Sequence, residues 1–294
     1  MEILRVGDVY PHPTCAAVGS FDGLHRAHRY ILGRCGVLSD ELKTLVITFG
    51  EHPRRDGDLL FTTEEKLEAL EEMGVDAVLL LERKDMALKA EEFVSLLITH
   101  LRVRRLLMGY DHRFGRGREG SPDWLVARLK DYSFETYVFP PLKYDGEVVS
   151  SSRIRQLLKE GKVERANLLL GYPYRITGEV VKGEGWGRRL GFPTANLKVP
   201  PEKLLPADGV YAVLVPQVRR YGVMHIGARP TLNLRRSVEV HILNFEGKVP
   251  EKLKVHILAR IRGVMRFPSP EALREQIRRD IELMNSIINR LATL

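Results

Sequence analysis

The chain has 294 residues, and its 46 Lys and Arg against 38 Asp and Glu give a formal net charge of +8. This length predicts about two domains, each large enough to bury a core of its own. An apolar fraction of 44% with 29% charged residues is typical of globular proteins, and no apolar run approaches the roughly 20 residues of a membrane-spanning helix.

The amino-terminal segment and the cysteines favour a reducing compartment. The chain begins Met-Glu-Ile-Leu-Arg, which lacks the basic-then-apolar order of a signal peptide. Cys15 and Cys35 lie in segments typical of core elements, so we expect no disulfide framework and a cytosolic location. The positive charge suits anionic partners. Nucleotide substrates and mere solubility explain it about equally well, and nucleic acid explains it less well.

The first half alternates strand-like with helix-like runs, an order that predicts a parallel α/β sheet. Helix starts are marked by the capping-box spacing Thr62-Thr-Glu-Glu65 and by Ser121-Pro122, a serine N-cap followed by proline. The expected strands are residues 14–18, 44–49, 76–81, 105–108 and 136–139.

The second half changes to a period of two, which predicts an antiparallel barrel. Two short helices over residues 150–171 precede it, and we place the domain boundary between residues 170 and 171, giving domains 1–170 and 171–294. A closing amphipathic helix begins at Ser269-Pro270, and its basic face is expected to be solvated. The expected strands are residues 176–182, 210–215, 222–226, 238–245 and 253–259.

One candidate phosphate site lies in the glycine turn that follows the first strand. There His25 and His28 stand three residues apart at an expected helix start, so both rings point to one side of the first turn. They could donate hydrogen bonds to a phosphate beside the positive end of the helix dipole. A bare pair with this spacing is more often two surface histidines. A zinc site is less favoured, because no third ligand has an obvious spacing nearby.

Four segments, in order, resemble the nucleotidyltransferase half of bacterial bifunctional riboflavin kinase/FAD synthetase: Gly19–His28, Thr48–Pro53, Gly109–Gly115 and Val149–Arg155. The resemblance implies that His25 and His28 stabilise the transition state at the α-phosphate of ATP. It also implies that Arg155 is a catalytic residue that holds the phosphates from a second helix start. The nucleotide-binding residues that it implies are Gly19, Phe21, Asp22, Gly23, Asp111, Ser151 and Ser152.

The second half resembles the kinase half of the same family, above all in Gly187-Arg-Arg-Leu-Gly-Phe-Pro-Thr-Ala-Asn-Leu197. Gly187, Thr194 and Asn196 would then bind ATP, and Thr194 and Asn196 would also contact Mg²⁺. Glu239 would be the base that takes the proton of the riboflavin 5′-hydroxyl, and Arg262 would bind the flavin. The alternation of side chains along this strand supports part of this assignment, because it places Glu239 and His241 on the polar face of the strand. On base rates alone, however, such a glutamate is a solvated strand residue.

The resemblance therefore implies a cytosolic enzyme with two active sites, one that phosphorylates riboflavin to FMN with ATP·Mg²⁺ and one that transfers AMP from ATP to FMN, giving FAD and pyrophosphate. We expect small-molecule substrates, no nucleic-acid partner and no membrane partner; the oligomeric state is left open. One alternative is that a single half is active, since the chain departs from the family pattern at Ala27, His112, Asn244, Val249-Pro250 and Val264. Another is a basic RNA-binding protein, although the barrel strands have few stacking aromatics.

Overall fold

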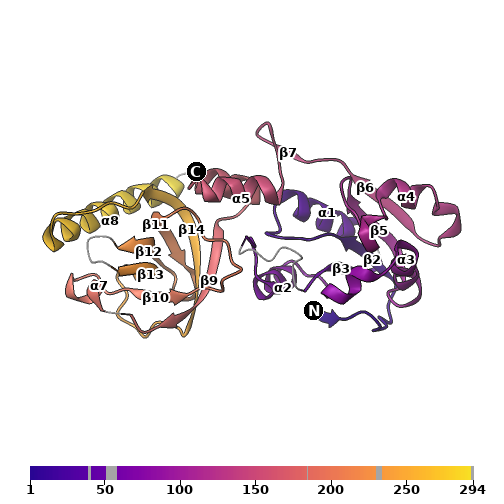
Figure 1. Ribbon diagram of the computed structural model, residues 1–294, viewed down its shortest axis with the longest axis horizontal. Coiled ribbons are helices and arrows are strands. Elements are labelled where there is room, and N and C mark those ends of the chain that lie inside the picture. Colours follow the sequence, from indigo (N-terminus) through magenta and orange to yellow (C-terminus); the bar gives the residue numbers. More distant parts are fainter. Residues whose placement is uncertain (39–40, 51–57, 184, 230–233, 293–294) are drawn as a thin grey trace. The chain divides into compact units, whose positions relative to one another are not determined.

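The structure is a computed structural model that describes residues 1–38, 41–50, 58–183, 185–229 and 234–292. It consists of two compact units, Met1–Ser151 and Ser152–Leu294. The predicted fold class is confirmed, because the first unit contains a parallel sheet and the second a closed antiparallel barrel with a terminal helix (Figure 1). This division assigns the two short helices to the second unit, while the domain boundary at residues 170/171 stays a prediction.

The sheet of the first unit has six parallel strands in the order β1-β4-β3-β2-β5-β6. Its central strands are rich in small and β-branched residues and are buried, as expected when helices cover both faces. The strands are β1 (Glu2–Leu4), β2 (Thr14–Val18), β3 (Lys43–Phe49), β4 (Ala77–Leu81), β5 (Val103–Gly109) and β6 (Glu135–Phe139). The helices are α1 (Arg26–Val37), α2 (Thr63–Glu72), α3 (Ala90–Thr99) and α4 (Pro122–Val126), and a two-stranded sheet joins β7 (Lys143–Tyr144) to β8 (Glu147–Val148).

The strand order reverses direction at β2. From β2 the chain proceeds through β3 and β4 on one side, whereas β5 pairs with β2 on the other side, with Val18 opposite Met108. In open parallel sheets, ligands bind at such a switch point, outside the carboxyl ends of the two strands. The glycine turn after β2 and the segment after β5 therefore meet at the edge where a nucleotide is expected.

A disulfide joins Cys15 of β2 to Cys35 of α1, with a Cα–Cα distance of 5.8 Å. The expectation of no disulfide was wrong for this pair. Both side chains are fully buried where α1 packs on β2, and this packing brings together two residues that are 20 apart in sequence. The disulfide fixes α1 to the strand that carries the glycine turn.

The barrel of the second unit has six antiparallel strands in the closed order β10-β13-β12-β11-β14-β9. Alternate residues of β14 are buried, in agreement with the predicted period of two. The strands are β9 (Tyr174–Val181), β10 (Ala195–Lys198), β11 (Gly209–Val215), β12 (Arg220–Arg229), β13 (Leu234–Ile242) and β14 (Lys252–Arg262). Five were expected, whereas β10 was recognised only as part of a motif.

The described residues of the second unit form four α-helices, and the longest, α8, packs against β11, β12 and β14 (Figure 1). Its N-cap is Ser269, whose hydroxyl accepts a hydrogen bond from the amide of Ala272. The apolar face packs around the fully buried Met284, while Arg278 and Arg279 are exposed and pair with Glu275, as expected for a solvated basic face. The helices are α5 (Ser151–Lys159), α6 (Val163–Leu170), α7 (Trp186–Arg189) and α8 (Pro270–Ala292).

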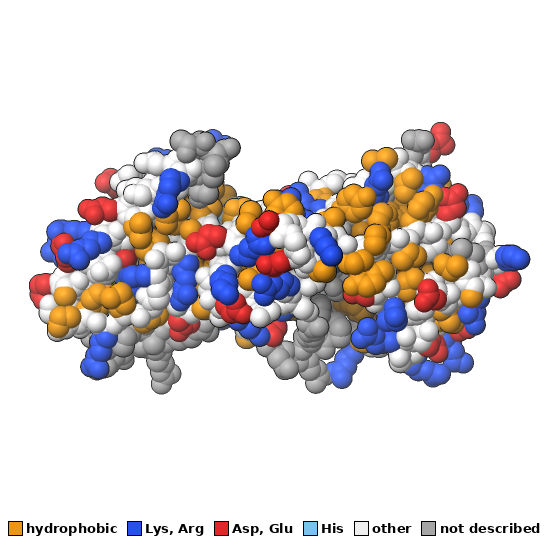
Figure 2. Space-filling model, turned by 90° about the horizontal axis from the view of Figure 1, so that it is seen from above, with side chains coloured by type: hydrophobic (Ala, Val, Ile, Leu, Met, Phe, Trp, Pro, Cys, Tyr) orange, Lys and Arg blue, Asp and Glu red, His pale blue; other side chains and the backbone are white. Residues whose placement is uncertain are grey.

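The surface charge is mixed in sign. On the face shown in Figure 2, basic side chains alternate with acidic and apolar ones over both units. In the part of the chain that the structure describes, no helix has the length and apolar character that a membrane crossing requires.

The disulfide generates the first prediction. Replacing both Cys15 and Cys35 by alanine should lower the free energy of unfolding of the first unit by about 3 kcal/mol, because the crosslink closes a 20-residue loop in the unfolded chain. Chemical denaturation without reductant measures this difference. Alkylation of the denatured parent protein is the control: it should find no thiol, and two free thiols would contradict the assignment.

Candidate active sites

The glycine turn after β2 is a rigid loop. Phe21 and Leu24 adopt positive φ angles of 47° and 37°, which non-glycine residues rarely accept, and Gly23 has a φ of 79°. The side chains of Phe21 and Leu24 are each only 1% exposed. Because these two side chains are anchored in the core, the loop has a fixed path between β2 and α1.

The two histidines form one stack at the start of α1. His25 is the N-cap, and its Nδ1 accepts a hydrogen bond from the backbone amide of His28 at 3.4 Å. The rings lie 3.6 Å apart at an angle of 13°, and the ring of Phe21 lies 5.1 Å from that of His28. The first turn of α1 has no acidic residue that would repel an anion. The structure therefore brings both predicted residues to one face of a helix start.

Asp22 holds the loop in place. Its side chain is 1% exposed and accepts hydrogen bonds from the backbone amides of Leu60 and Phe61 at 3.2 and 2.9 Å. The hydroxyl of Ser151 donates to the carbonyl oxygen of Asp22 at 3.0 Å. Ser151, the last residue of the first unit, thus contacts the glycine loop.

Two other predicted residues of this region lie in the first turn of α5, within the second compact unit. They are Ser152 and Arg155, and the Arg155 side chain is buried. Their contacts with phosphate stay predictions. Residues 51–53 of the expected nucleotide segment fall outside the described residues.

Asp111 and His112 follow the carboxyl end of β5, on the other side of the switch point. Asp111 is exposed. The Nε2 atom of His112 is enclosed and has no hydrogen-bond partner among the described residues. Burial lowers the pKa of His112 to about 4, so this imidazole is neutral at pH 7.

In the barrel, Glu239 of β13 is held by two hydroxyl groups. Its Oε2 accepts a hydrogen bond from Thr194 at 3.2 Å, and its Oε1 accepts one from Ser237 at 2.7 Å. The side chain is only 5% exposed. Period two is right in placing it opposite Val238 and Val240, but the polar face of the strand is covered, so the base-rate expectation of a solvated glutamate was wrong.

Thr194 directly precedes β10 (Ala195–Lys198), and Asn196 is the second residue of this strand. Asn196 pairs with Glu239 in the register of β10 and β13. A Cβ added at Gly183 would overlap the side-chain amide of Asn196. One added at Gly187 would overlap the carbonyl oxygen of Phe192 and lie 2.9 Å from the Thr194 hydroxyl oxygen. A side chain at Gly187 would therefore collide with the backbone, whereas one at Gly183 would require the Asn196 amide to move.

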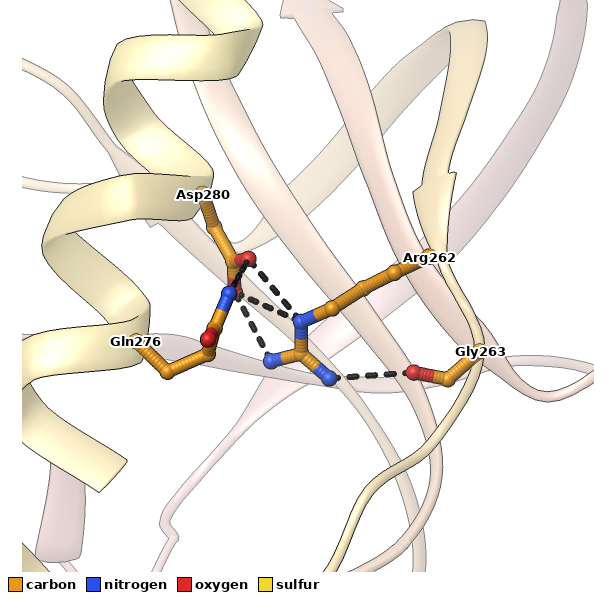
Figure 3. A network of polar contacts seen from close by, with 4 residues as sticks. All are labelled: Arg262, Gly263, Gln276 and Asp280. Atoms are coloured by element: carbon orange, nitrogen blue, oxygen red, sulfur yellow. Dashed lines mark hydrogen bonds and ion pairs between the residues drawn. The ribbon is translucent and has the colours of Figure 1, made fainter. Parts of the chain in front are cut away.

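Arg262, at the end of β14, is fixed by α8 (Figure 3). Its Nε and Nη2 donate to the carboxylate of Asp280 at 2.9 and 2.7 Å, and its Nη1 donates to the carbonyl oxygen of Gly263 at 3.0 Å. Gln276 donates a further hydrogen bond to Asp280 at 2.9 Å. The Asp280 side chain is 3% exposed, so this is a buried, bidentate ion pair.

Thr194, Glu239 and Arg262 line one pocket in the second unit, whose cavity volume is about 110 Å³. Thr194, Glu239 and Arg262 lie at its polar side. Much of the lining is apolar, and part of it comes from the segment after β14 and from α8: Val264, Met265, Phe267, Leu273 and Ile277.

Sequence reasoning missed three side chains that hold the site. Ser237 is the second partner of Glu239, and His241 holds the carbonyl oxygen of Pro193 at 2.8 Å, next to Thr194. Asp280 could have been identified from the sequence, because it lies three residues after Ile277 on the apolar face of α8. A carboxylate on such a face indicates a buried cation.

Comparison with known proteins gives two family models, each of which matches a different part of the chain. Residues 8–153 match the family model described as FAD synthetase, and residues 170–288 match the one described as riboflavin kinase. The chain is 37% identical to the bifunctional riboflavin kinase/FMN adenylyltransferase of Escherichia coli (strain K12), covering 92% of this chain and 91% of the relative. The chain belongs to the bifunctional riboflavin kinase/FMN adenylyltransferase family.

Further relatives agree in length and organisation. The protein of the same name from Bacillus subtilis (strain 168) is 32% identical and covers 90% of this chain and 89% of the relative. A solved structure described as a macrolide-efflux protein from Streptococcus pneumoniae is 27% identical, has a TM-score of 0.85 and covers 97% of this chain and 99% of the other. The riboflavin kinase activity belongs to the barrel, and the FMN adenylyltransferase activity to the parallel α/β unit.

The ion pair in the kinase pocket generates the second prediction. Asp280→Asn should raise the riboflavin KM about tenfold, because Arg262 loses the charge that orients it, and should lower the unfolding free energy of the second unit by about 3 kcal/mol. Steady-state kinetics and chemical denaturation measure the two effects. Glu275→Gln is the matched control on the same helix, with a change below about 0.5 kcal/mol. An unchanged riboflavin KM in Asp280→Asn would show that Arg262 does not act on the flavin.

Proposed function

We propose that Glu239 is the general base of the riboflavin kinase reaction. It is a buried carboxylate, held in one orientation by Thr194 and Ser237, at the polar side of the pocket. Proton removal from the riboflavin 5′-hydroxyl makes its oxygen a better nucleophile toward the γ-phosphorus of ATP. The oxygen–phosphorus bond forms, the bond to the β-phosphate oxygen breaks, and ADP leaves.

Thr194 and Asn196 are proposed to hold the ATP phosphates and their Mg²⁺. The Thr194 hydroxyl donates its hydrogen bond to Glu239, so its oxygen lone pairs remain to face a cation. Hydroxyl, amide and carboxylate oxygens are the hard donors that Mg²⁺ prefers, and the residues therefore fit the metal. Bound with ATP, Mg²⁺ would neutralise charge on the phosphates, while Gly187 lets the chain pass close to them.

The apolar part of the pocket is proposed to bind the flavin ring. Val264, Met265 and Phe267 lie on one side and Leu273 and Ile277 of α8 also line it, so a flat aromatic ring would be removed from water there. Arg262, oriented by Asp280, supplies a fixed cationic group at the edge of this apolar lining. The same helix that closes the barrel thus sets the flavin-binding surface.

In the first unit, His25 and His28 are proposed to stabilise the transition state at the α-phosphate of ATP. An oxygen of the FMN phosphate attacks the α-phosphorus and pyrophosphate leaves, so catalysis needs positioned donors rather than a covalent intermediate. The stacked rings at the start of α1 lie beside the positive end of the helix dipole. Nucleotide contacts are proposed for Gly19, Phe21, Asp22, Gly23, Asp111, Ser151 and Ser152, with Arg155 as a charged donor.

We also propose that the enzyme works in the cytosol, where its substrate ATP is abundant. Disulfides are rare in that compartment, but the complete burial of Cys15 and Cys35 shields this one from dissolved thiols. Its small-molecule partners are ATP, riboflavin and FMN.

The single observation that supports the two-site assignment most strongly is the separation of the histidine pair from the residues proposed for the kinase reaction. His25 and His28 lie in the first unit, whereas Glu239, Thr194 and Asn196 lie in the second. Because no segment is shared by these two groups of residues, each reaction should fail without the other.

This separation generates the third prediction. Glu239→Gln should slow riboflavin phosphorylation by about 10²- to 10⁴-fold, because the variant keeps the shape of the side chain but loses the base. Conversion of added FMN to FAD should continue at the parent rate. Chromatography of flavins, with riboflavin and FMN supplied in separate assays, measures both steps.

His28→Ala should have the reverse effect, which is the fourth prediction. It removes a donor proposed for the α-phosphate, so FAD and pyrophosphate formation should fall by about 10²- to 10³-fold while riboflavin is still converted to FMN. Circular dichroism is the control for folding. Formation of FAD at the parent rate would assign His28 to structure instead, and a parent protein that stops at FMN would favour the alternative with one active half.

A further inference from the structure

A buried lysine stands where two segments of the adenylyltransferase unit meet. Lys66 lies in the first half of α2, and its side chain is 3% exposed. Its ammonium group donates hydrogen bonds to three acceptors: the carbonyl oxygen of Ser20 at 3.1 Å, the hydroxyl of Thr48 at 3.2 Å and the carbonyl oxygen of Phe49 at 3.0 Å. Each of the three N–H donors of the ammonium group can therefore have one acceptor.

The acceptors belong to two neighbouring strand ends. Ser20 is the second residue of the glycine loop that follows β2, whereas Thr48 and Phe49 end β3, which pairs with β2. The Thr48 hydroxyl also donates to the carbonyl oxygen of Ser20, at 2.9 Å, and the amide of Gly19 donates to the carbonyl oxygen of Ile47, at 3.1 Å. The ammonium group thus ties the start of the glycine loop to the adjacent strand.

We propose that Lys66 is a positioning residue for adenylyl transfer, which fixes the path of the glycine loop and thereby the place of the His25 and His28 rings. It acts through Ser20, five residues before His25, and its three donors are all used within the protein. The proposal rests on the adenylyltransferase site proposed for this loop. A loop held before substrate binds lets the site align ATP without reorganisation in the transition state.

The charge of Lys66 does not serve stability. Burial lowers its pKa to about 8, an effect that the negative charge of Asp22 opposes. Because this value lies below that of the unfolded chain, the native state binds the proton more weakly than the unfolded state does. The stability of the unit therefore rises with pH above about 8, and the charged form at pH 7 costs stability. An apolar side chain of similar length would avoid this cost.

The test compares Lys66→Met with Lys43→Met. Lys43 is the matched control, because it is a half-exposed lysine at the opposite end of β3, where it pairs with Asp76. Lys66→Met should lower kcat/KM for FMN adenylylation about 100-fold, the effect of a misplacement of about 1 Å in a catalytic group. The variant should keep the circular dichroism spectrum of the parent, and riboflavin phosphorylation should stay within twofold of the parent. Lys43→Met should stay within twofold in both reactions.

Adenylylation by a folded Lys66→Met protein within threefold of the parent would overturn the proposal. If Lys66→Met does not fold, Thr48→Val decides, since it keeps the shape of Thr48 but removes one acceptor and the bond to Ser20. About tenfold slower adenylylation in a folded Thr48→Val protein supports the proposal, and parent-like activity overturns it.

The pH profile gives a readout that a purely structural role would not change. Deprotonation of Lys66 removes one donor, so kcat/KM of the parent should fall above about pH 8. The charged group of the loop that acts on Lys66 is Asp22; β3 contributes neutral acceptors, and Glu65 of α2 is engaged in its capping box. A flat profile up to pH 9.5 would contradict the proposal. A parent protein that makes no FAD from FMN would instead contradict the proposed adenylyltransferase site.

Discussion

The cost of burying charge is the constraint on which both sites depend. An ionised group that leaves water without fixed partners costs several kcal/mol, so buried charges survive only where hydrogen bonds or opposite charges hold them. Asp22, Lys66, Glu239 and Asp280 are all at least 95% buried, and each has such partners. Asp22 and Glu239 lie in segments that the sequence associates with nucleotide or flavin, whereas Lys66 and Asp280 form hydrogen bonds with residues of such segments, Ser20 and Arg262. At these four positions the buried charge is part of a proposed site or supports one.

The two units catalyse related phosphorus-transfer reactions with different folds. Both must align an oxygen nucleophile with a phosphorus atom of ATP and stabilise negative charge. The parallel sheet does so at its switch point, where a strained loop and a helix start face the same edge. The barrel uses neighbouring strands, since the register of β10 and β13 places Asn196 beside Glu239. In each case the rigid sheet places the polar groups, and a helix completes the site.

The elements set by local chemistry could be predicted from the sequence. The capping box at Thr62 and the serine N-cap at Ser121 are present, and the change from helix-like to period-two patterning marks the barrel. The motif residues Thr194 and Glu239 could be identified only through the family resemblance, since a lone strand glutamate predicts nothing specific. The hydrogen bond between them depends on strand pairing across 45 residues.

Features that depend on long-range partners could not be predicted. The Cys15–Cys35 disulfide requires α1 to pack on β2, and the pairing of Arg262 with Asp280 requires α8 to cross the barrel. Lys66 follows two glutamates in a polar helix start, where a solvent-exposed lysine is the natural expectation. Its burial arises because the end of β3 and the glycine loop close over it.

The central claim is that one chain carries out two successive phosphorus-transfer reactions at separate sites. The most direct measurement is a time course with purified protein, riboflavin, ATP and Mg²⁺, in which flavins and released phosphates are quantified together. The account predicts that FMN appears first, that FAD follows after a lag, and that each FAD is accompanied by one ADP and one pyrophosphate. FMN that remains the final flavin product with no pyrophosphate released, or FAD formed without release of ADP, would contradict it.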